Sequence, residues 1–337
     1  MTAALDIIAP GPLTTAQDGG RTGWLRYGVP GSGALDRRAL AVANVLVGNL
    51  PDAGALEMTL AGGTFAVRGS ALRIALAGAD MPLAIDGEAA SRDRSYTLVP
   101  GAVIRVGAAR NGARAYLAVA GTFAIAPVFG SVSTHRRAGI GGIDGGALKA
   151  GMVLPAAGPP PSGPELRFTG EMPPSARIRI VLGPQDDYFT AAALATLGEA
   201  AFTVTPQADR MGLRLAGPPL AHAKGFNIVS DAIAPGSIQV PGDGQPIVLL
   251  ADRQTTGGYP KIATVISADL PALGQMRPGD SIRFEVVGIA AAVAARRALL
   301  AWIAALPQRA VPVTTALASE RLLGANLISG VTDGSGA

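Results

Sequence analysis

The sequence of 337 residues contains no cysteine, and only 4% of its residues are aromatic. Without cysteine, the chain has no thiol nucleophile, disulfide or thiolate metal site of its own. With few aromatic residues, alanine, valine, leucine and isoleucine must fill most of the core. The two histidines, His135 and His222, lie far apart and lack the spacing of metal ligands, which argues against a histidine-based metal centre.

Charge is also scarce, and its pattern excludes two classes of partner. Charged residues make up 15% of the chain, the net charge is +4, and no basic stripe alternates with aromatic residues, so we expect no nucleic-acid partner. The most apolar segment, residues 287–306, carries Arg296 and Arg297 at its centre, where a membrane-spanning helix tolerates charge least. We therefore predict a packed helix there and no membrane association. The first twenty residues do not resemble a signal peptide, and we expect a cytoplasmic protein.

The standard nucleotide and hydrolase motifs are missing as well. The sequence contains no GxxxxGK followed by Ser or Thr, no GxGxxG between a strand and a helix, and no GxSxG. If a nucleotide takes part in the reaction, its site is therefore either of an unusual kind or on another chain.

Glycine and proline are abundant, with 45 and 26 residues, and they separate many short apolar runs. This pattern predicts a mainly β fold with a few helices. One helix is expected from Leu35 to Gly48, with Asp36 as its N-cap, and a second at residues 190–200. The Pro/Gly-rich segment 154–165 suggests an N-terminal domain of residues 1–160, a C-terminal domain of residues 161–310 and a tail of residues 311–337. A Pro-Gly turn leads into an alternating strand in both halves, which hints at two related barrels.

The segment "ADRQTTGGYPK", residues 251–261, is the strongest local indication of a functional site. Gly257 and Gly258 can take positive φ angles and turn successive amides toward an anion, forming a nest. Neighbouring side chains add hydroxyl, amide, phenol and ammonium groups: Gln254, Thr255, Thr256, Tyr259 and Lys261. The alternative is a β-hairpin turn whose polar residues have no chemical role.

Other polar residues lie in turns between apolar strands, where β-barrels often build sites. Asp209 and Arg210 form one such group, Asp231 and Gln239 a second, and Asp252 follows a buried strand. Ser133 and Thr134, beside two arginines, suggest either an anion-binding loop or an ordinary glycine-rich loop, and the ordinary loop is favoured on these residues alone. Glu57 is expected to pair with an arginine.

Four segments together resemble a known family. They are "QDGGRTGWLRYGVPGSGALDRRALAVANVLVGN", "STHRRAGIGGIDGGALKAG", "PQADRMGLRL" and "GSIQVPGDGQPIVLLADRQTTGGYPKIATVISADLPALGQMRPGD". The chain is similar to the biotin-dependent carboxyltransferase family, also called allophanate hydrolase subunit 2. That family includes the C subunit of the bacterial ATP-dependent 5-oxoprolinase, which the chain resembles most. The resemblance implies two cyclophilin-like β-barrel domains.

The resemblance also implies an activity and partners. It indicates one subunit of an ATP-dependent 5-oxoprolinase, which opens 5-oxo-L-proline to L-glutamate with a homologous B subunit and a third, lactam-utilisation subunit, and which we expect to be inactive alone. It leaves open whether ATP binds here or on a partner. One alternative is transfer of CO₂ from carboxybiotin to urea or a related amide, with biotin on another protein because no "MKM" segment occurs here. Another is a non-catalytic regulator of a kinase-inhibitor subunit.

For an amide substrate, the residues divide into two expected roles. Donors must surround the developing negative charge, and a base must orient Lys261 or activate water. We expect catalytic roles for Lys261, Asp209, Asp231 and Asp252. We expect substrate binding by Gln239, Gln254, Thr255, Thr256, Gly257, Gly258, Tyr259, Arg210, Ser133 and Thr134.

Overall fold

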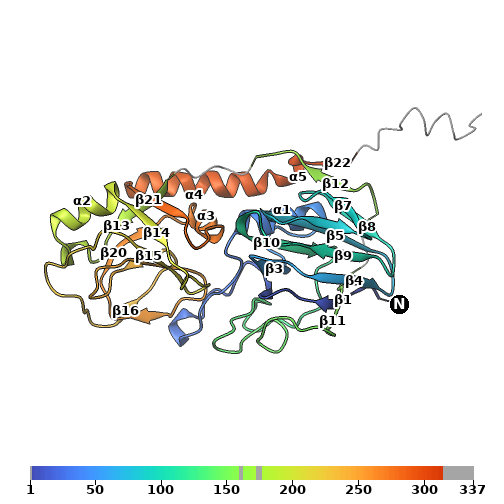
Figure 1. The fold of residues 1–337 in the computed structure, drawn as a ribbon, viewed down its shortest axis with the longest axis horizontal. Coiled ribbons are helices and arrows are strands. Elements are labelled where there is room, and N and C mark those ends of the chain that lie inside the picture. The colour runs from blue at the N-terminus through green and yellow to red at the C-terminus, as the bar shows by residue number, and fades with distance from the viewer. Residues whose placement is uncertain (1, 159–161, 172–176, 314–337) are drawn as a thin grey trace, which may run out of the picture.

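The computed structural model describes residues 2–158, 162–171 and 177–313. Its elements form two β-rich units joined along one side by a long helix (Figure 1). The expected boundary at residue 160 and the expected tail from residue 314 onward lie outside the described residues. No helix in the described ranges is long and apolar enough to cross a membrane.

The N-terminal unit consists of two antiparallel sheets that share one core. Leu5 and Phe65 from one sheet and Leu56 and Leu117 from the other are fully buried in this core. The first sheet has the order β11 (Val153–Pro155), β1 (Ala4–Ala9), β4 (Thr64–Arg68), β9 (Val103–Val106), β6 (Leu83–Ile85) and β7 (Glu88–Ala90). The second has the order β2 (Thr14–Gln17), β3 (Ala55–Thr59), β10 (Asn111–Val119), β5 (Leu72–Asp80) and β8 (Ser95–Leu98).

The C-terminal unit contains a closed seven-stranded barrel, as expected for this half of the chain. Its core holds Phe202, Phe284 and the aliphatic residues around them. The strands follow the order β13 (Ile178–Leu182), β20 (Lys261–Val265), β17 (Ser237–Gln239), β18 (Ile247–Leu249), β15 (Gly212–Ala216), β14 (Ala201–Val204) and β21 (Ser281–Val286). Strands β13 and β21 pair in parallel, and this pairing closes the barrel.

Shorter elements surround the barrel or connect it to the first unit. A two-stranded ribbon, β16 with β19, carries part of the expected site. Strands β12 and β22 pair beside the N-terminal unit. These elements are β16 (Asp231–Ala232), β19 (Thr256–Gly257), β12 (Leu166–Phe168), β22 (Ala310–Pro312), α2 (Ala191–Glu199), α3 (Leu270–Gly274), α5 (Leu306–Arg309) and the 3₁₀ turns η1 (Leu25–Tyr27) and η2 (Asp186–Tyr188).

Helix α1 (Arg37–Leu46) confirms the expected helix start. The Asp36 carboxylate accepts hydrogen bonds from the backbone amides of Arg38 and Ala39 at 3.0 and 3.1 Å. These bonds satisfy two of the amides that a helix N-terminus leaves without partners. Nine of the ten residues of α1 are buried, so the helix packs against the sheet that contains β5 and β10.

Helix α4 (Ile289–Ala304) lies where a helix was predicted, but it is packed only in part. Among its residues Leu299 and Trp302 are buried, whereas Ile289 is 71% exposed and Val293 and Leu300 are also exposed. The helix leaves the barrel after β21 and ends against the N-terminal unit, where Trp302 and the following Leu306 join the core around α1 (Figure 1). Helix α4 therefore connects the two units.

Candidate functional site

Lys261 and Asp231, two of the expected catalytic residues, form an ion pair at the edge of the barrel. The Lys261 side chain at the start of β20 is buried, and its Nζ donates to Asp231 Oδ2 at 2.6 Å. The Asp231 side chain on β16 remains 49% exposed. The hydrogen bond from Lys261 lowers the pKa of Asp231, so the carboxylate stays ionised. A fixed ammonium thus lies beside a carboxylate that reaches solvent.

Amide side chains surround this pair. Gln185 accepts a hydrogen bond from the Lys261 backbone amide at 3.1 Å and donates to Asp231 at 3.4 Å. Gln254 donates to Gln239 at 3.3 Å, and Gln239 of β17 pairs with Lys261 of β20. Sequence reasoning missed Gln185, which lies in the loop after β13 and carries no motif that distinguishes it. The structure therefore brings Lys261, Asp231, Gln239 and Gln254 into one region and adds Gln185.

The expected glycine nest is wrong. Neither Gly257 nor Gly258 has a positive φ angle, and Gly257 lies in β19, paired with Asp231 of β16. A Cβ atom on Gly257 would lie 2.7 Å from Ile233 Cδ1 and 2.8 Å from Gln239 Nε2. Gly257 therefore lies close to the ends of two side chains and forms no nest.

The remaining expected residues in and beside the ribbon differ in exposure. Thr256 and Tyr259 are exposed, with Tyr259 at 41%, and Thr255 is half-buried. The backbone carbonyl of Thr255 accepts a hydrogen bond from Ile233, and that of Tyr259 accepts one from Gln239. The exposed residues Thr256 and Tyr259 thus lie within five positions of Lys261 and face solvent.

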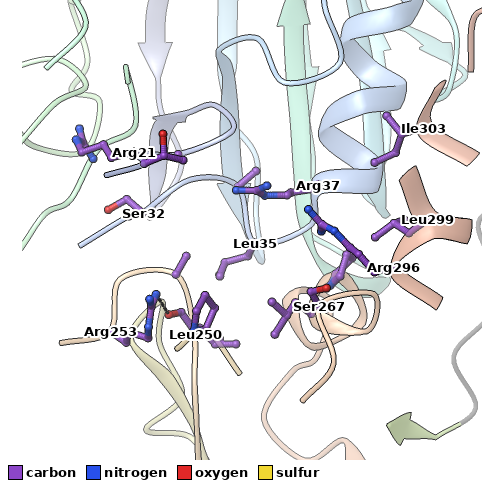
Figure 2. A pocket seen from close by; sticks show the side chains of 18 of the residues that line it. Arg21, Ser32, Leu35, Arg37, Leu250, Arg253, Ser267, Arg296, Leu299 and Ile303 are labelled. Carbon is purple, nitrogen blue, oxygen red and sulfur yellow. Dashed lines mark hydrogen bonds between the residues drawn. The ribbon is translucent and has the colours of Figure 1, made fainter. Parts of the chain in front are cut away.

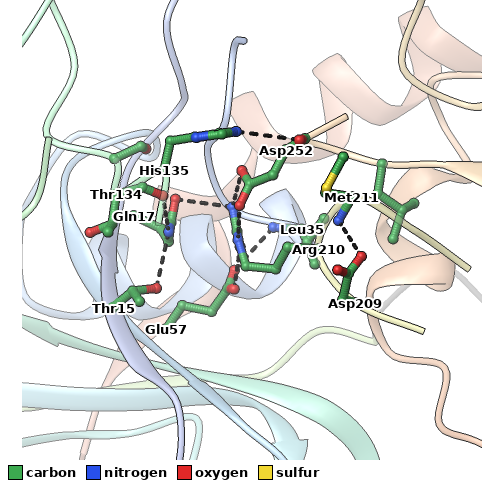
Figure 3. Close-up of polar contacts among 12 residues, drawn as sticks. Thr15, Gln17, Leu35, Glu57, Thr134, His135, Asp209, Arg210, Met211 and Asp252 are labelled. Carbon is green, nitrogen blue, oxygen red and sulfur yellow. Dashed lines mark hydrogen bonds and ion pairs between the residues drawn. The ribbon is translucent and has the colours of Figure 1, made fainter. Parts of the chain in front are cut away.

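Arg210 lies elsewhere, buried at the junction of the two units (Figure 3). Its guanidinium holds Asp252 through two bonds of 2.8 and 3.1 Å, pairs with Glu57, and donates to the Gly33 carbonyl at 2.7 Å. Burial lowers the pKa of Arg210, but Glu57 and Asp252 outweigh that effect, and the pKa lies above its ordinary value. The expected pairing of Glu57 with an arginine is confirmed.

Of the three acids considered as partners for Lys261, the structure selects Asp231. Asp252 is committed to Arg210. Asp209 turns toward its own loop, where it accepts hydrogen bonds from the amides of Met211 and Gly212 at 2.8 and 3.2 Å (Figure 3). Sequence proximity alone gave no means of separating these three carboxylates.

Ser133 and Thr134 use their hydroxyls inside the N-terminal unit. Both are buried, and Ser133 Oγ donates to Asp18 Oδ1 at 2.5 Å while accepting from the Asp18 amide at 2.9 Å. Thr134 Oγ1 donates to the Ala16 carbonyl at 3.1 Å. These bonds fasten the loop to the end of β2, which fits the ordinary-loop interpretation of this segment.

A cavity of about 510 Å³ opens between the two units (Figure 2). We call it the arginine cavity because Arg21, Arg37, Arg253 and Arg296 line it. No Asp or Glu is among the described residues of its wall. The rest of the wall is largely apolar and includes Leu35, Leu250, Leu270, Leu299 and Ile303. The sequence gave no indication of it, because its arginines come from four separate segments.

The arginines of this cavity differ in their bonds. The Arg21 guanidinium donates to the backbone carbonyls of Val128 and Ser133. Arg253 donates to the carbonyls of Ile233 and Leu250 at 3.0 and 3.4 Å. Burial lowers the pKa of Arg253 to about 10. Carbonyl oxygens supply dipoles but no negative charge, so these bonds do not neutralise the cations.

Comparison with known proteins places these features in a family. Residues 27–286 match the family described as carboxyltransferase domain, subdomain A and B. The chain is 38% identical over 293 residues to the C subunit of 5-oxoprolinase from Escherichia coli, covering 87% of this chain and 94% of that protein. It is 30% identical to the urea amidolyase of Saccharomyces cerevisiae, covering 83% of this chain. The solved urea carboxylase of Kluyveromyces lactis superposes with a TM-score of 0.83 at 27% identity over 92% of this chain.

The two groups of relatives differ in length. The chain spans nearly all of the bacterial 5-oxoprolinase subunit, but only 16% of the yeast urea amidolyase and 30% of the urea carboxylase chain. The matched region is thus almost the whole protein in one group of relatives and one part of a longer protein in the other.

Proposed function

Because the chain belongs to the family of carboxyltransferase domains of subdomains A and B, we propose that it is the C subunit of an ATP-dependent 5-oxoprolinase. In this assignment it acts with a homologous B subunit and a third subunit to open 5-oxo-L-proline to L-glutamate. The observation that carries the proposal is 38% identity to a bacterial 5-oxoprolinase subunit across 94% of that protein's length. Similarity over a whole chain supports a shared role better than similarity over one domain of a multifunctional enzyme.

The substrate sets the chemical task. The lactam of 5-oxoproline is a resonance-stabilised amide, so ring opening by water requires negative charge on the carbonyl oxygen to be stabilised. ATP hydrolysis supplies the free energy for ring opening. The ATP site belongs to the assembly of three subunits and is not assigned to this chain. This chain contributes positioned hydrogen-bond donors and a carboxylate.

The Lys261–Asp231 pair is the part of this chain that best fits that task. The ammonium is held at 2.6 Å from the carboxylate, so its position costs no reorganisation during the reaction. Asp231 stays ionised and reaches solvent, so it can accept a hydrogen bond from water and position it. Thr256 on the facing strand, next to the Gly257 that pairs with Asp231, adds a hydroxyl donor.

Reconstitution of the three subunits tests this proposal. We expect Lys261→Ala and Thr256→Ala to lower the rate of glutamate release from 5-oxoproline and ATP, by about a hundredfold or more where a donor to the transition state is lost. Lys149→Ala, which removes an exposed lysine of the N-terminal unit, is the matched control and should leave the rate unchanged. Thermal melting of each variant separates lost catalysis from lost folding, because Lys261 is buried. Unchanged turnover in both Lys261→Ala and Thr256→Ala would contradict the assignment of the site to the Lys261–Asp231 pair.

Carboxyltransfer is the second candidate, and the yeast relatives favour it. The urea amidolyase matches 83% of the present chain in sequence, and the urea carboxylase superposes on 92% of it. In that case the chain would receive a carboxyl group from biotin presented by another protein and pass it to urea or a related amide. The reconstituted system distinguishes the two: glutamate formation supports the hydrolase, whereas urea-dependent ATP consumption after addition of a biotinylated carrier, a biotin carboxylase and bicarbonate supports the transferase.

A further inference from the structure

We propose that the arginine cavity binds a small phosphate-bearing molecule. Arg37 comes from the start of α1, Arg253 from the loop after β18, and Arg296 from the middle of α4. Figure 2 shows Arg37 and Arg296 near each other on one side of the cavity and Arg253 on the other. The proposal stands whether or not the chain is part of a 5-oxoprolinase.

The electrostatics of the cavity favour an anion of more than one charge. In the described part of the chain, none of Arg37, Arg253 and Arg296 has a carboxylate within 4.0 Å, in contrast to the neighbouring Arg210, which has two. Although the Arg37 side chain reaches solvent, desolvation and the charge of Arg296 lower its pKa, and Asp18 and Asp52 act in the opposite direction. Like charges brought together at the cavity wall repel each other unless an anion lies between them. A phosphate carries about −1.5 to −2 charges at neutral pH and therefore compensates them better than one carboxylate.

The donor chemistry agrees with the charge. Guanidinium groups present planar pairs of N–H donors that match the oxygens of phosphates and carboxylates. In the same wall Ser32 is buried, and its Oγ has no hydrogen-bond partner among the described residues. A phosphate offers enough oxygens to bond several such donors at once.

The size and the apolar wall indicate an organic ligand rather than a bare ion. A volume of about 510 Å³ lies within the range of about 300–1,000 Å³ that is usual for small-molecule sites. Leu35, Leu270 and Ile303 offer apolar surface for the part of the ligand that carries no charge. The ligand would contact both units and α4 simultaneously, so it would stabilise their arrangement.

Calorimetric titration of the full chain tests the proposal. The probes are inorganic phosphate, pyrophosphate and ATP. The control ligand is 5-oxoproline, a small anion that carries one carboxylate and no phosphate. We expect pyrophosphate or ATP to bind, and binding to weaken as salt is added, because charge supplies much of the affinity. Tighter binding of ATP than of pyrophosphate would indicate that the apolar wall is used, and equal binding would indicate a site for the phosphate groups alone. Both results support a phosphate site.

Two neighbouring arginines of α4 give a matched pair of variants. Arg296 lines the cavity, whereas Arg297 is exposed and does not. We expect Arg296→Gln to raise the Kd about tenfold or more, the usual effect of losing a charge-assisted hydrogen bond. Arg296→Lys should retain part of the affinity, and Arg297→Gln all of it. Equal loss in Arg296→Gln and Arg297→Gln, absence of binding by every phosphate-bearing probe, or tighter binding of 5-oxoproline would each overturn the proposal.

Discussion

At the scale of single residues, some charged side chains are paired with one another inside the protein, whereas others are open to a ligand. Arg210 pairs with both Glu57 and Asp252 at the junction of the units, and all three side chains are nearly inaccessible to solvent. The Tyr116 hydroxyl extends this network, donating to Glu57 at 2.7 Å and accepting from the Asp36 amide at 2.8 Å. Burial and the nearby Glu57 raise the pKa of Tyr116, so it remains a donor. A network with all its charges paired is suited to holding structure.

Arg210→Met should reveal that role. The substitution leaves the Glu57 and Asp252 carboxylates buried without their cation, and removing one partner of a buried pair costs about 3–5 kcal/mol. Arg137→Met is the control, because Arg137 is 69% exposed and its pair with Asp209 spans 3.9 Å. A surface pair of this kind contributes at most about 1 kcal/mol. Urea titration followed by circular dichroism measures both free energies of unfolding, and equal values for the two variants would contradict the structural role of Arg210.

At the scale of elements, α4 joins the two units while keeping little of itself buried. Its first turns expose alanine, valine and isoleucine, whereas its last turns insert Leu299 and Trp302. Trp302 packs edge-on against Phe168 of β12, with ring centroids 6.1 Å apart. The anchoring free energy of the helix is therefore concentrated near its C-terminal end.

Because α4 is anchored unevenly, substitution by alanine at its two ends should change the free energy of unfolding by very different amounts. Trp302→Ala removes a large buried side chain from the core around α1 and should lower the free energy of unfolding by about 3–5 kcal/mol. Ile289→Ala, at a position that is 71% exposed, should change it by no more than about 0.5 kcal/mol. Chemical denaturation of both variants provides the comparison. Similar losses at the two positions would mean that α4 is anchored along its whole length.

At the scale of the whole molecule, the two units are linked by hydrogen bonds to the backbone as well as by charges. Gln275, just after α3, accepts hydrogen bonds from the amides of Ala113 and Arg114 in β10 at 3.0 and 3.1 Å. Its Nε2 donates to the Asp36 side chain at 2.9 Å. In return, Arg114 donates to the Gly274 carbonyl at 2.6 Å. Gln275 Nε2 also donates to the Arg114 carbonyl at 2.9 Å, so one side chain of the C-terminal unit satisfies four polar groups of the N-terminal unit.

Loss of this side chain should weaken the connection between the units. Gln275→Ala leaves two β10 amides without an acceptor, and each unsatisfied buried group costs about 1–3 kcal/mol. We expect the thermal unfolding midpoint to fall and the transition to broaden as the units lose mutual support. Gln308→Ala, an exposed glutamine in α5, should leave the melting curve unchanged. Calorimetry would decide: an unaltered transition in Gln275→Ala would show that these bonds contribute little.

The sequence alone determined the features that depend on neighbouring residues. Turn residues and short apolar runs predicted a mainly β chain, and the Asp36 cap marked the start of α1. Motifs extending over most of the chain indicated the family, which the comparisons confirm. Local bonding rules act within a few residues, so a linear reading is sufficient for them.

Only the tertiary structure decided which charges meet. Arg210 and Glu57 are 153 positions apart, and Lys261 had three candidate acids until the pairing of β16 with β19 brought Asp231 to it. Gly257 and Gly258 were expected to form a nest, but neither takes a positive φ angle. Arg37, Arg253 and Arg296 become neighbours of one cavity because α4 crosses from the barrel to the N-terminal unit. Electrostatic interactions depend on distance in space, and that distance is set by how the two units pack.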